Sequence, residues 1–299
     1  EYQSYIDQLV YAEKLGFDMF VANETSYEPM LMLGAAALDA EAAADTDPSQ
    51  LPDPEMPMVY QNALKLALNQ KHYDKAVKYA KLYQGTNPTA PEDHALIGQA
   101  YYLGGDYAGA KDLAQKNIDA AVAAACAARQ GAWGQKTAAQ RGELMLKFAH
   151  LVLQHQDRLA WIEAHDTGKP ITQARADIKA VARYFDFYGG AADKFHGEVI
   201  PYLNDYSVTL VREPLGVTAH ITPWNYPAQM FGRTLAPALA MGNAVVLKPA
   251  EEACLVTLEL AQLAHEAGFP AGSLNIVTGY GELAGAALTR HPDINFVSF

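Results

Sequence analysis

Two short runs of apolar, β-branched residues constrain the fold of the second half of this chain. Residues 217–221 (ValThrAlaHisIle) and 244–247 (AlaValValLeu) have the composition of buried strands. The first run leads to Asn225 in a turn, and the second delivers Lys248 and, three residues later, Glu251. Because ligands of open α/β sheets bind at the carboxyl ends of the strands, an amide, an ammonium and a carboxylate are expected on one side of the sheet.

The same half of the chain alternates between strand-like and helix-like segments. Strands are expected near 208–212, 217–221, 244–248, 274–277 and 294–299, and helices near 229–241, 255–267 and 282–290. This alternation is typical of a parallel, doubly wound sheet, so an α/β fold is predicted. An earlier long helix is expected to start at a capping box of Thr137 and Gln140, with Phe148 and Leu159 on its inward stripe.

Residues 59–122 contain an internal repeat of 34 residues, the tetratricopeptide period. Leu64, Ala67, Tyr73, Ala76 and Ala80 recur as Gly98, Tyr101, Tyr107, Ala110 and Ala114. The segment resembles tetratricopeptide repeats, which implies stacked helical hairpins with Tyr73 and Tyr107 in equivalent sites. Two alternatives stay open: a surface that binds a protein partner, or a helical spacer.

Composition excludes several functional classes. The formal net charge is −12 and the pI about 5.1, so no nucleic-acid partner is expected. No apolar run is long enough to span a bilayer. The given sequence does not start with the basic and then apolar segments of a signal peptide, so none is expected in it. Two cysteines make no disulfide framework, which fits the cytoplasm, and no histidine has metal-ligand spacing to other ligands.

Charge is distributed unevenly along the chain. Residues 1–118 hold eight Lys, no Arg and seventeen acidic residues, whereas 119–299 hold six Lys, eight Arg and seventeen acidic residues. The pattern predicts a mosaic with four parts: a short αβ fragment (1–27), an acidic, proline-containing linker (28–58), the helical repeats (59–122) and the α/β region (123–299). The segment 5–24 resembles one αβ step of the flavin-dependent luciferase-like barrels, but a single step cannot close a barrel.

The α/β region resembles the NAD(P)-dependent aldehyde dehydrogenases over residues 123–299. The matching motifs, in chain order, are ThrGlyLysPro (167–170), AlaAspLysPheHisGly (192–197), ArgGluProLeuGlyVal (212–217), ProTrpAsnTyrPro (223–227), LysProAlaGlu (248–251), GluAlaGlyPheProAlaGlySerLeuAsnIleValThrGly (266–279) and PheValSerPhe (296–299). The resemblance implies thiolate attack on an aldehyde, hydride transfer to the cofactor and hydrolysis of a thioester.

The resemblance also implies roles for individual residues. Asn225 is the expected catalytic residue, because its amide would stabilise the oxyanion. Lys248 and Glu251 are expected to grip the adenosine ribose, and the carboxylate would repel a 2′-phosphate, which favours NAD over NADP. Ile221, Thr222, Pro223 and Trp224 would line the nicotinamide side, and Gly281 begins the helix beside the adenine.

The expected substrate tunnel follows the asparagine. By resemblance it is lined by Tyr226, Gln229, Met230 and Arg233. Arg233 has two readings: it could pair with the carboxylate of an acidic aldehyde, or with a structural acidic residue. The resemblance implies a small-molecule aldehyde as the substrate. A second copy of the chain and a protein bound by the repeats are the other partners that are considered.

The chain reaches Phe299 before the family's Gly-Ser turn, base and nucleophilic cysteine. Neither Cys126 nor Cys254 stands at that cysteine's position, so no turnover by this chain alone is expected. Three hypotheses follow: the amino-terminal part of an NAD-dependent aldehyde dehydrogenase, an interaction scaffold without turnover, or a composite of unrelated fragments.

Overall fold

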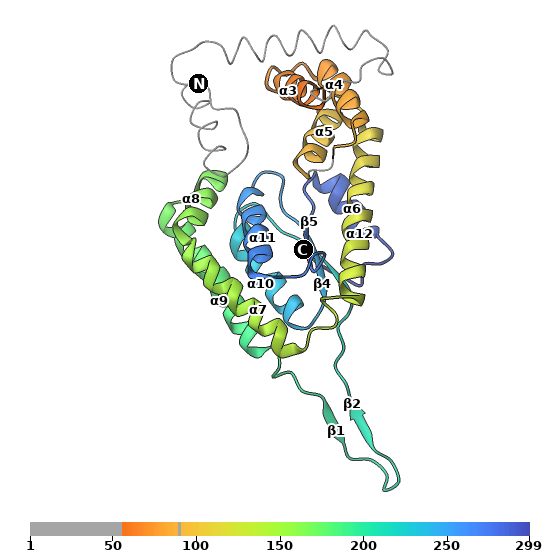
Figure 1. Ribbon diagram of the computed structural model, residues 1–299, viewed down its shortest axis with the longest axis vertical. Helices are drawn as coiled ribbons and strands as arrows, with labels where there is room; N and C mark the ends of the chain where they lie inside the picture. The colour runs from red at the N-terminus through yellow and green to blue at the C-terminus, as the bar shows by residue number, and fades with distance from the viewer. Residues whose placement is uncertain (1–55, 89–90) are drawn as a thin grey trace. The chain divides into compact units, whose positions relative to one another are not determined.

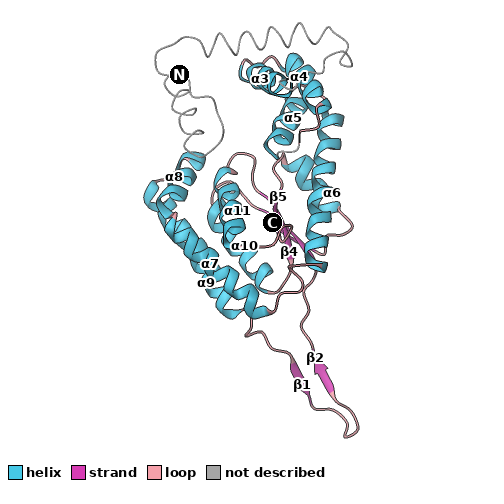
Figure 2. Cartoon of the chain, in the orientation of Figure 1, coloured by secondary structure: helices cyan, strands magenta, loops and turns pink. Residues whose placement is uncertain are grey.

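The computed structural model describes residues 56–88 and 91–299 (Figures 1 and 2). The expected αβ fragment at 1–27 and nearly all of the expected linker at 28–58 lie outside these residues. The helices are α3 (Met56–Asn69), α4 (Tyr73–Gly85), α5 (Pro91–Leu103), α6 (Tyr107–Gln130), α7 (Ala138–Gln154), α8 (Gln156–Thr167), α9 (Ile171–Ala191), α10 (Pro227–Ala240), α11 (Leu255–Ala267) and α12 (Ala286–Arg290), with a π-helical turn η2 (Gly281–Gly285) before α12. The strands are β1 (Glu198–Ile200), β2 (Val208–Leu210), β3 (Val217–Ile221), β4 (Ala244–Lys248), β5 (Leu274–Ile276) and β6 (Phe296–Ser298).

The described chain divides into two compact units. Among the described residues, one unit contains 56–88 together with Ala100–Gly105, and the other contains 91–99 and Asp106–Phe299. The boundary near 119–125, expected from the charge distribution, falls inside α6, which continues unbroken from Tyr107 to Gln130. The division into four parts stays a prediction.

The 34-residue repeat recurs in the local backbone as well as in the sequence. Lys71 and Gly105 both have positive φ, at 60° and 80°. The hydrogen bond from Lys71 N to Leu68 O recurs as the one from Gly105 N to Tyr102 O. Tyr73 and Tyr107 each begin a helix, but Tyr73 is half-buried and Tyr107 is 60% exposed, so their surroundings differ. Whether the helices stack as tetratricopeptide hairpins stays a prediction.

The larger unit is built on a four-stranded parallel sheet of order β5-β4-β3-β6. The predicted α/β class and the parallel pairing are confirmed. The central strand β4 begins with the apolar run 244–247 and is buried at all five positions, because helices cover the sheet. In Figure 1, β4 and β5 lie between α6 on one side and α10 and α11 on the other, as in a doubly wound sheet.

The helical layer is held together by aromatic side chains. The ring centroids of Phe148 on α7 and Phe185 on α9 are 4.4 Å apart, and Phe231 on α10 and Phe269 lie within 6.2 Å of Phe148. Edge-to-face pairs of this kind add stability beyond the area that they bury. Trp133 is fully buried and donates its indole N–H to Asn243 O at 2.9 Å, which ties the loop after α6 to the start of β4.

The expected long helix after the capping box is two helices. Thr137 and Gln140 form the predicted capping box, but α7 ends at Gln154 and α8 starts at Gln156. His155 separates them with φ −99° and ψ 15°, which moves Leu159 onto a second axis. The backbone break at a single residue leaves no mark in the hydrophobic spacing.

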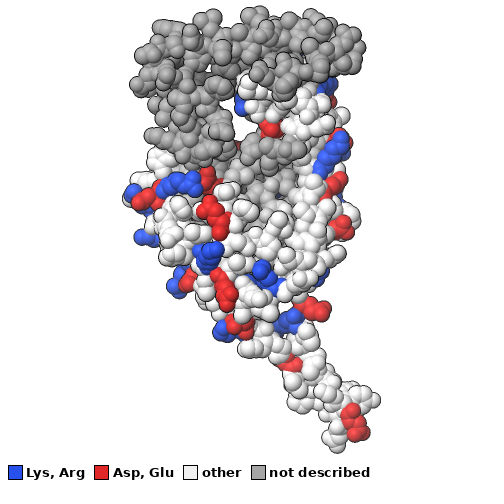
Figure 3. Space-filling model, viewed as in Figure 1, with Lys and Arg blue, Asp and Glu red and all other residues white. Residues whose placement is uncertain are grey.

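The strand expected near 208–212 does not belong to the parallel sheet. β2 pairs antiparallel with β1 in a separate hairpin, with Val199 opposite Thr209. Apolar side chains are exposed along it, including Val199 at 78% and Tyr202 at 68%, and Figure 3 shows mostly uncharged side chains there. Exposed apolar surface of this extent typically marks a place where another protein surface binds.

No helix in the part of the chain that the structure describes is long and apolar enough to cross a membrane.

Candidate cofactor and oxyanion site

The carboxyl ends of β3 and β4 lie side by side. Ile221 is in register with Lys248, and the amide of Thr222 donates to Lys248 O at 3.1 Å. The chain leaves β3 for β4 through α10, and it returns to the other side of β3 as β6 through η2 and α12. The strand order therefore reverses at β3, and such a reversal opens a crevice at the carboxyl ends of the strands.

Lys248, Glu251 and Gly281 come together at this edge of the sheet. The buried Lys248 Nζ is 2.5 Å from Glu251 Oε2, and the amide of Gly281 donates to Glu251 Oε1 at 3.3 Å. Burial alone raises the pKa of Glu251, but the hydrogen bonds from Lys248 and the backbone outweigh it and lower that pKa. A negatively charged, partly exposed carboxylate is thus held in place beside the start of η2.

The four residues expected on the nicotinamide side follow one another out of β3. Ile221 Cδ1 lies 3.8 Å from the position that a β-carbon on Gly285 would take, so β3 contacts η2 here. Thr222 is buried, whereas Pro223 and Trp224 are exposed. Within residues 56–88 and 91–299, Thr222 Oγ1 is buried without a hydrogen-bond partner.

Asn225 stands in the turn between β3 and α10. The residue is exposed, and its side-chain amide has no hydrogen bond to any described residue. Pro227 occupies the first turn of α10, where its missing N–H costs nothing. The amide of Asn225 can therefore donate to a ligand, and its direction depends on the backbone of this turn.

The four expected tunnel residues share one side of the start of α10. Tyr226 precedes the helix, and Gln229, Met230 and Arg233 follow at helical spacing. Tyr226 is 39% exposed and Arg233 is exposed, while Gln229 and Met230 are half-buried. Arg233 has no ion pair with any residue that the structure describes, so its role stays a prediction.

His220 is a buried polar residue that the sequence analysis left among the ordinary histidines. Its Nε2 lies 2.9 Å from Thr218 Oγ1, and its Nδ1 is buried with no partner in the described segments. Burial lowers the pKa of His220 to about 4, so the ring is neutral at physiological pH. Thr218 and His220 are two residues apart on β3, which places both polar side chains on one face of the strand.

Neither cysteine is activated. Burial raises the pKa of Cys126, and nearby Asp293 adds to the shift. Burial and then Asp166 raise the pKa of Cys254 to about 11, although the residue precedes α11. The expectation that neither residue acts as a nucleophile agrees with these environments.

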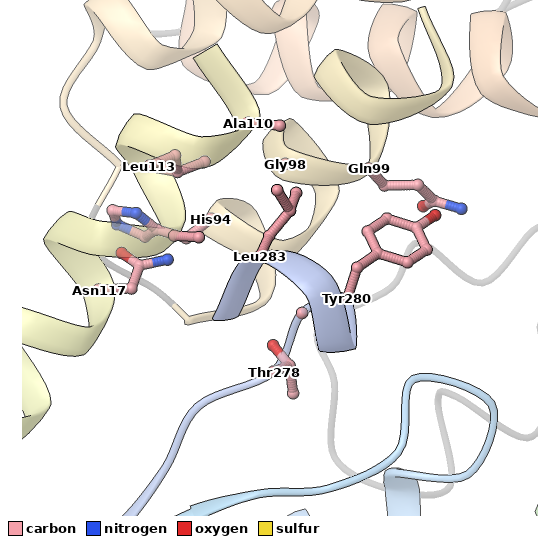
Figure 4. Close-up of a pocket in the computed structure, with 11 residues that line it drawn as sticks. His94, Gly98, Gln99, Ala110, Leu113, Asn117, Thr278, Tyr280 and Leu283 are labelled. Carbon is pink, nitrogen blue, oxygen red and sulfur yellow. The ribbon is translucent and has the colours of Figure 1, made fainter. Parts of the chain in front are cut away.

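A pocket elsewhere in the larger unit contains none of the predicted site residues (Figure 4). Its walls are side chains of α5, α6 and the segment Thr278–Leu283, among them His94, Asn117 and Tyr280. Leu283 reaches this pocket from η2, the turn whose first amide bonds to Glu251. No cluster of three or more metal-ligating side chains occurs among the described residues.

Residues 102–299 match the sequence profile of the aldehyde dehydrogenase family, which agrees with this geometry. The chain belongs to the aldehyde dehydrogenase family. The match covers the sheet, the helices around it and every residue of the predicted site.

Individual aldehyde dehydrogenases show the same relationship. The chain is 48% identical over 186 residues to the mitochondrial benzaldehyde dehydrogenase of Antirrhinum majus, covering 62% of this chain and 35% of that protein. It is 40% identical over 247 residues to an aldehyde dehydrogenase of Emericella nidulans, covering 82% of this chain and 46% of that one. The chain thus spans between a third and a half of the length of these relatives.

Solved structures agree with the sequence relatives. A putative aldehyde dehydrogenase from Burkholderia cenocepacia shares 59% identity at a TM-score of 0.62, over 62% of this chain and 39% of that one. The NAD+ complex of an aldehyde dehydrogenase from Bacillus cereus shares 43% identity at a TM-score of 0.60, over 61% of this chain and 38% of that one.

One charged cluster beside the site was not predicted. Lys169, in the ThrGlyLysPro motif, lies between the buried carboxylates of Glu163 and Asp177 and under the ring of Tyr226. The motif was visible in the sequence, but the two acidic partners stand six and eight residues away on different helices, and no spacing rule joins them.

Proposed function

We propose that this chain supplies the cofactor-binding and oxyanion-stabilising parts of an NAD-dependent aldehyde dehydrogenase that oxidises an aldehyde to a carboxylic acid. The observation that carries the proposal is the contact of Lys248 and Gly281 with Glu251 at the carboxyl edge of the sheet. Membership of the family and the likeness to the NAD+ complex from Bacillus cereus support it.

The Glu251 carboxylate suits a ribose. Its two oxygens have about four acceptor positions, and Lys248 and Gly281 use two of them. The remaining positions can accept hydrogen bonds from a pair of vicinal hydroxyls.

NAD, when bound, supplies the hydride acceptor of the reaction. Asn225 is the residue of this chain that would stabilise the oxyanion. Its unpaired side-chain amide can donate to the oxygen of an aldehyde as negative charge develops there. Loss of one such donor typically costs about two to three orders of magnitude in rate.

Glu251 also sets the preference between the two nicotinamide cofactors. A carboxylate with a lowered pKa stays ionised throughout the neutral range, so it would repel a phosphate on the ribose 2′ oxygen. NAD is therefore the proposed cofactor rather than NADP.

Calorimetric titration with NAD and NADP tests the proposal. NAD should bind the wild type more tightly than NADP, and Glu251→Ala should weaken NAD binding about 10- to 100-fold, since hydrogen bonds to a charged group are worth about 1.5–3 kcal/mol. Glu252→Ala, at the exposed neighbouring carboxylate, is the matched control and should bind NAD as the wild type does. Unchanged NAD affinity in Glu251→Ala would refute this site.

The β1–β2 hairpin suggests how the protein assembles. We propose that its exposed apolar side chains, such as Val199, Tyr202 and Tyr206, pack against a second copy of the chain. Analytical ultracentrifugation should show dimers or larger species, and Tyr202→Asp should shift them toward the monomer. A wild-type protein that is monomeric at micromolar concentration would contradict the proposal.

A further inference from the structure

Three charged side chains from three segments meet beneath the asparagine turn. Lys169 Nζ is 2.8 Å from Glu163 Oε1 on α8 and 2.8 Å from Asp177 Oδ2 on α9. The Glu163 and Asp177 side chains are 0% and 1% exposed, and that of Lys169 is 10% exposed. Asp177 accepts a further hydrogen bond from Gln173 Nε2 at 2.8 Å.

A contribution to the stability of the fold does not by itself account for such a buried charged cluster. Removing charges from water costs several kcal/mol per ion, and well-packed apolar residues of the same volume are often as stable. The lysine nevertheless stays charged: burial lowers the pKa of Lys169, but the hydrogen bonds to Asp177 and Glu163 outweigh burial and raise it. Burial raises the pKa of Glu163, while the hydrogen bond and charge of Lys169 act in the opposite direction; Glu163 Oε2 has no hydrogen bond within the described residues.

The cluster touches the asparagine turn at two places. Lys169 Nζ lies 4.7 Å from the centroid of the Tyr226 ring, within the range of a cation–π contact. The backbone amide of Ala228 faces the Glu163 carboxyl and favours its charged form. One contact is on the residue immediately after Asn225, and the other is three residues after it.

The turn lacks a local anchor that could replace these contacts. Tyr226 is the residue that caps α10, and its side chain makes no capping hydrogen bond. The first amides of a helix need acceptors, and a negative charge near them is favourable. The Glu163 carboxyl on α8 faces the Ala228 amide in the first turn of α10 and can supply that charge.

The platform under the turn is rigid. A β-carbon on Gly232 of α10 would come within 2.9 Å of Val181 Cα on α9, so the two helices meet backbone to backbone. Asp177 lies one turn before Val181 on α9, and Gly232 lies one turn after Ala228 on α10. The cluster is thus fixed to α9, and the turn is fixed to the cluster.

We propose that Lys169, held by Glu163 and Asp177, is a positioning residue that fixes the Asn225 turn through the Tyr226 ring and the first amides of α10. The proposal rests on the proposed role of Asn225 as oxyanion donor. In this proposal the contacts hold the Asn225 amide, which has no hydrogen bond of its own to the described residues, in one direction.

The expected loss follows from the geometry of such donors. A misplacement of about 1 Å can cost about 100-fold in rate. Lys169→Met keeps the length of the side chain and removes the charge, so in an active enzyme that contains residues 1–299 kcat should fall about 10- to 100-fold while the NAD affinity, set by Glu251, stays the same. Lys169→Arg keeps the charge and should retain most of kcat.

Hydrogen exchange measures how firmly Lys169 holds the Asn225 turn, and it does not require turnover. In Lys169→Met and Glu163→Gln, the amides of residues 225–230 should exchange about 10-fold faster than in the wild type, while those of β4 stay protected. The matched control is Lys179→Met, which removes an exposed lysine of α9, the helix that carries Asp177, and should change neither segment. Exchange at 225–230 that is unchanged in both cluster variants overturns the proposal.

A double-mutant cycle in an active enzyme that contains residues 1–299 separates the positioning role of Lys169 from the proposed role of Asn225. If Lys169 acts through Asn225, Lys169→Met should lower kcat in the wild type and have little further effect in Asn225→Ala. Additive losses overturn the positioning role, and so does an unchanged kcat in Lys169→Met when Asn225→Ala lowers it. An Asn225→Ala variant with full kcat instead refutes the proposed function. Hydrogen exchange alone then decides whether Lys169 fixes the Asn225 turn.

Discussion

Gly142 on α7 and Gly189 on α9 face each other with no side chain between them. A β-carbon on Gly142 would lie 2.5 Å from the carbonyl oxygen of Gly189, and one on Gly189 would lie 3.1 Å from the carbonyl oxygen of Gly142. The backbones of the two helices therefore touch at this crossing. The aromatic pair of Phe148 and Phe185 lies further along the same two helices and depends on this approach.

Gly142→Ala should lower the free energy of unfolding by about 1–3 kcal/mol, because a backbone oxygen cannot move aside as a flexible side chain can. Gly190→Ala, next to Gly189 on α9, is the control. The added β-carbon meets nothing within 4 Å, so the better helix propensity of alanine should raise the free energy of unfolding by up to about 1 kcal/mol. Urea unfolding of both variants measures the difference. Equal stabilities would show that the helices do not touch here.

His220 predicts how stability depends on pH. Its pKa is lowered by burial from 6.5 to about 4, so the unfolded chain binds a proton in the window between these values and the folded chain does not. Stability is therefore present above pH 6.5 and is lost as the pH falls toward 4. The difference of about 2.5 pKa units corresponds to about 3 kcal/mol.

His220→Gln should remove this loss, so its unfolding free energy should fall less steeply than that of the wild type between pH 6.5 and 4. His196→Gln changes an exposed histidine and should keep the wild-type slope. Thermal unfolding at several pH values in this window compares the three proteins. Identical slopes for wild type and His220→Gln would contradict a buried, neutral ring.

The two cysteines predict the reactivity of the polypeptide 1–299. With a pKa of about 11, Cys254 is almost entirely a protonated thiol at pH 7, and burial keeps Cys126 above its ordinary pKa as well. Alkylation by iodoacetamide at pH 7 should therefore be slower than for an unhindered thiol of the same concentration. This polypeptide with NAD and aliphatic, aromatic or acidic aldehydes should form no NADH above a buffer control, and a protein-dependent rate would contradict the prediction.

The sequence predicted the parts of the fold that depend on neighbouring residues. The helix at 255–267 and the strands at 217–221 and 244–248 have the predicted bounds, because each is a compact apolar pattern bounded by turn residues. The pairing of β2 with β1 was missed, since three-residue strands with exposed side chains carry no alternation to detect. η2 was expected as an ordinary helix, because a π-helical turn has no signal in the spacing of apolar residues.

The site divides in the same way. Lys248 and Glu251 are three residues apart, so their contact could be expected from the sequence, and Gly281 follows a strand that pairs with β4. The cluster around Lys169 could not be expected, because it depends on how α8, α9 and α10 pack. Lys169 meets Glu163 of α8, Asp177 of α9 and the ring of Tyr226 before α10, and only the packing of these helices decides that.

Lys71 and Gly105 test whether the 34-residue period is structural. Both have positive φ, and the bond from Gln70 N to Leu66 O before the first recurs as the bond from Gly104 N to Ala100 O before the second. A residue with a β-carbon is strained in this conformation by about 1–2 kcal/mol, whereas glycine is not. Lysine is therefore the less favourable residue at the first copy of a turn that has glycine at the second.

Lys71→Gly should accordingly raise the free energy of unfolding by up to about 1 kcal/mol, because the relief of strain exceeds the extra freedom of glycine in the unfolded chain. Gly105→Ala should lower it by about 1 kcal/mol for the opposite reason, although its β-carbon would meet no atom within 4 Å. Gly85→Ala, at a helical glycine with equally open surroundings and no positive φ, should be neutral or stabilising. Thermal unfolding of the three variants decides the matter, and a Lys71→Gly variant less stable than the wild type would mean that the two turns are not equivalent.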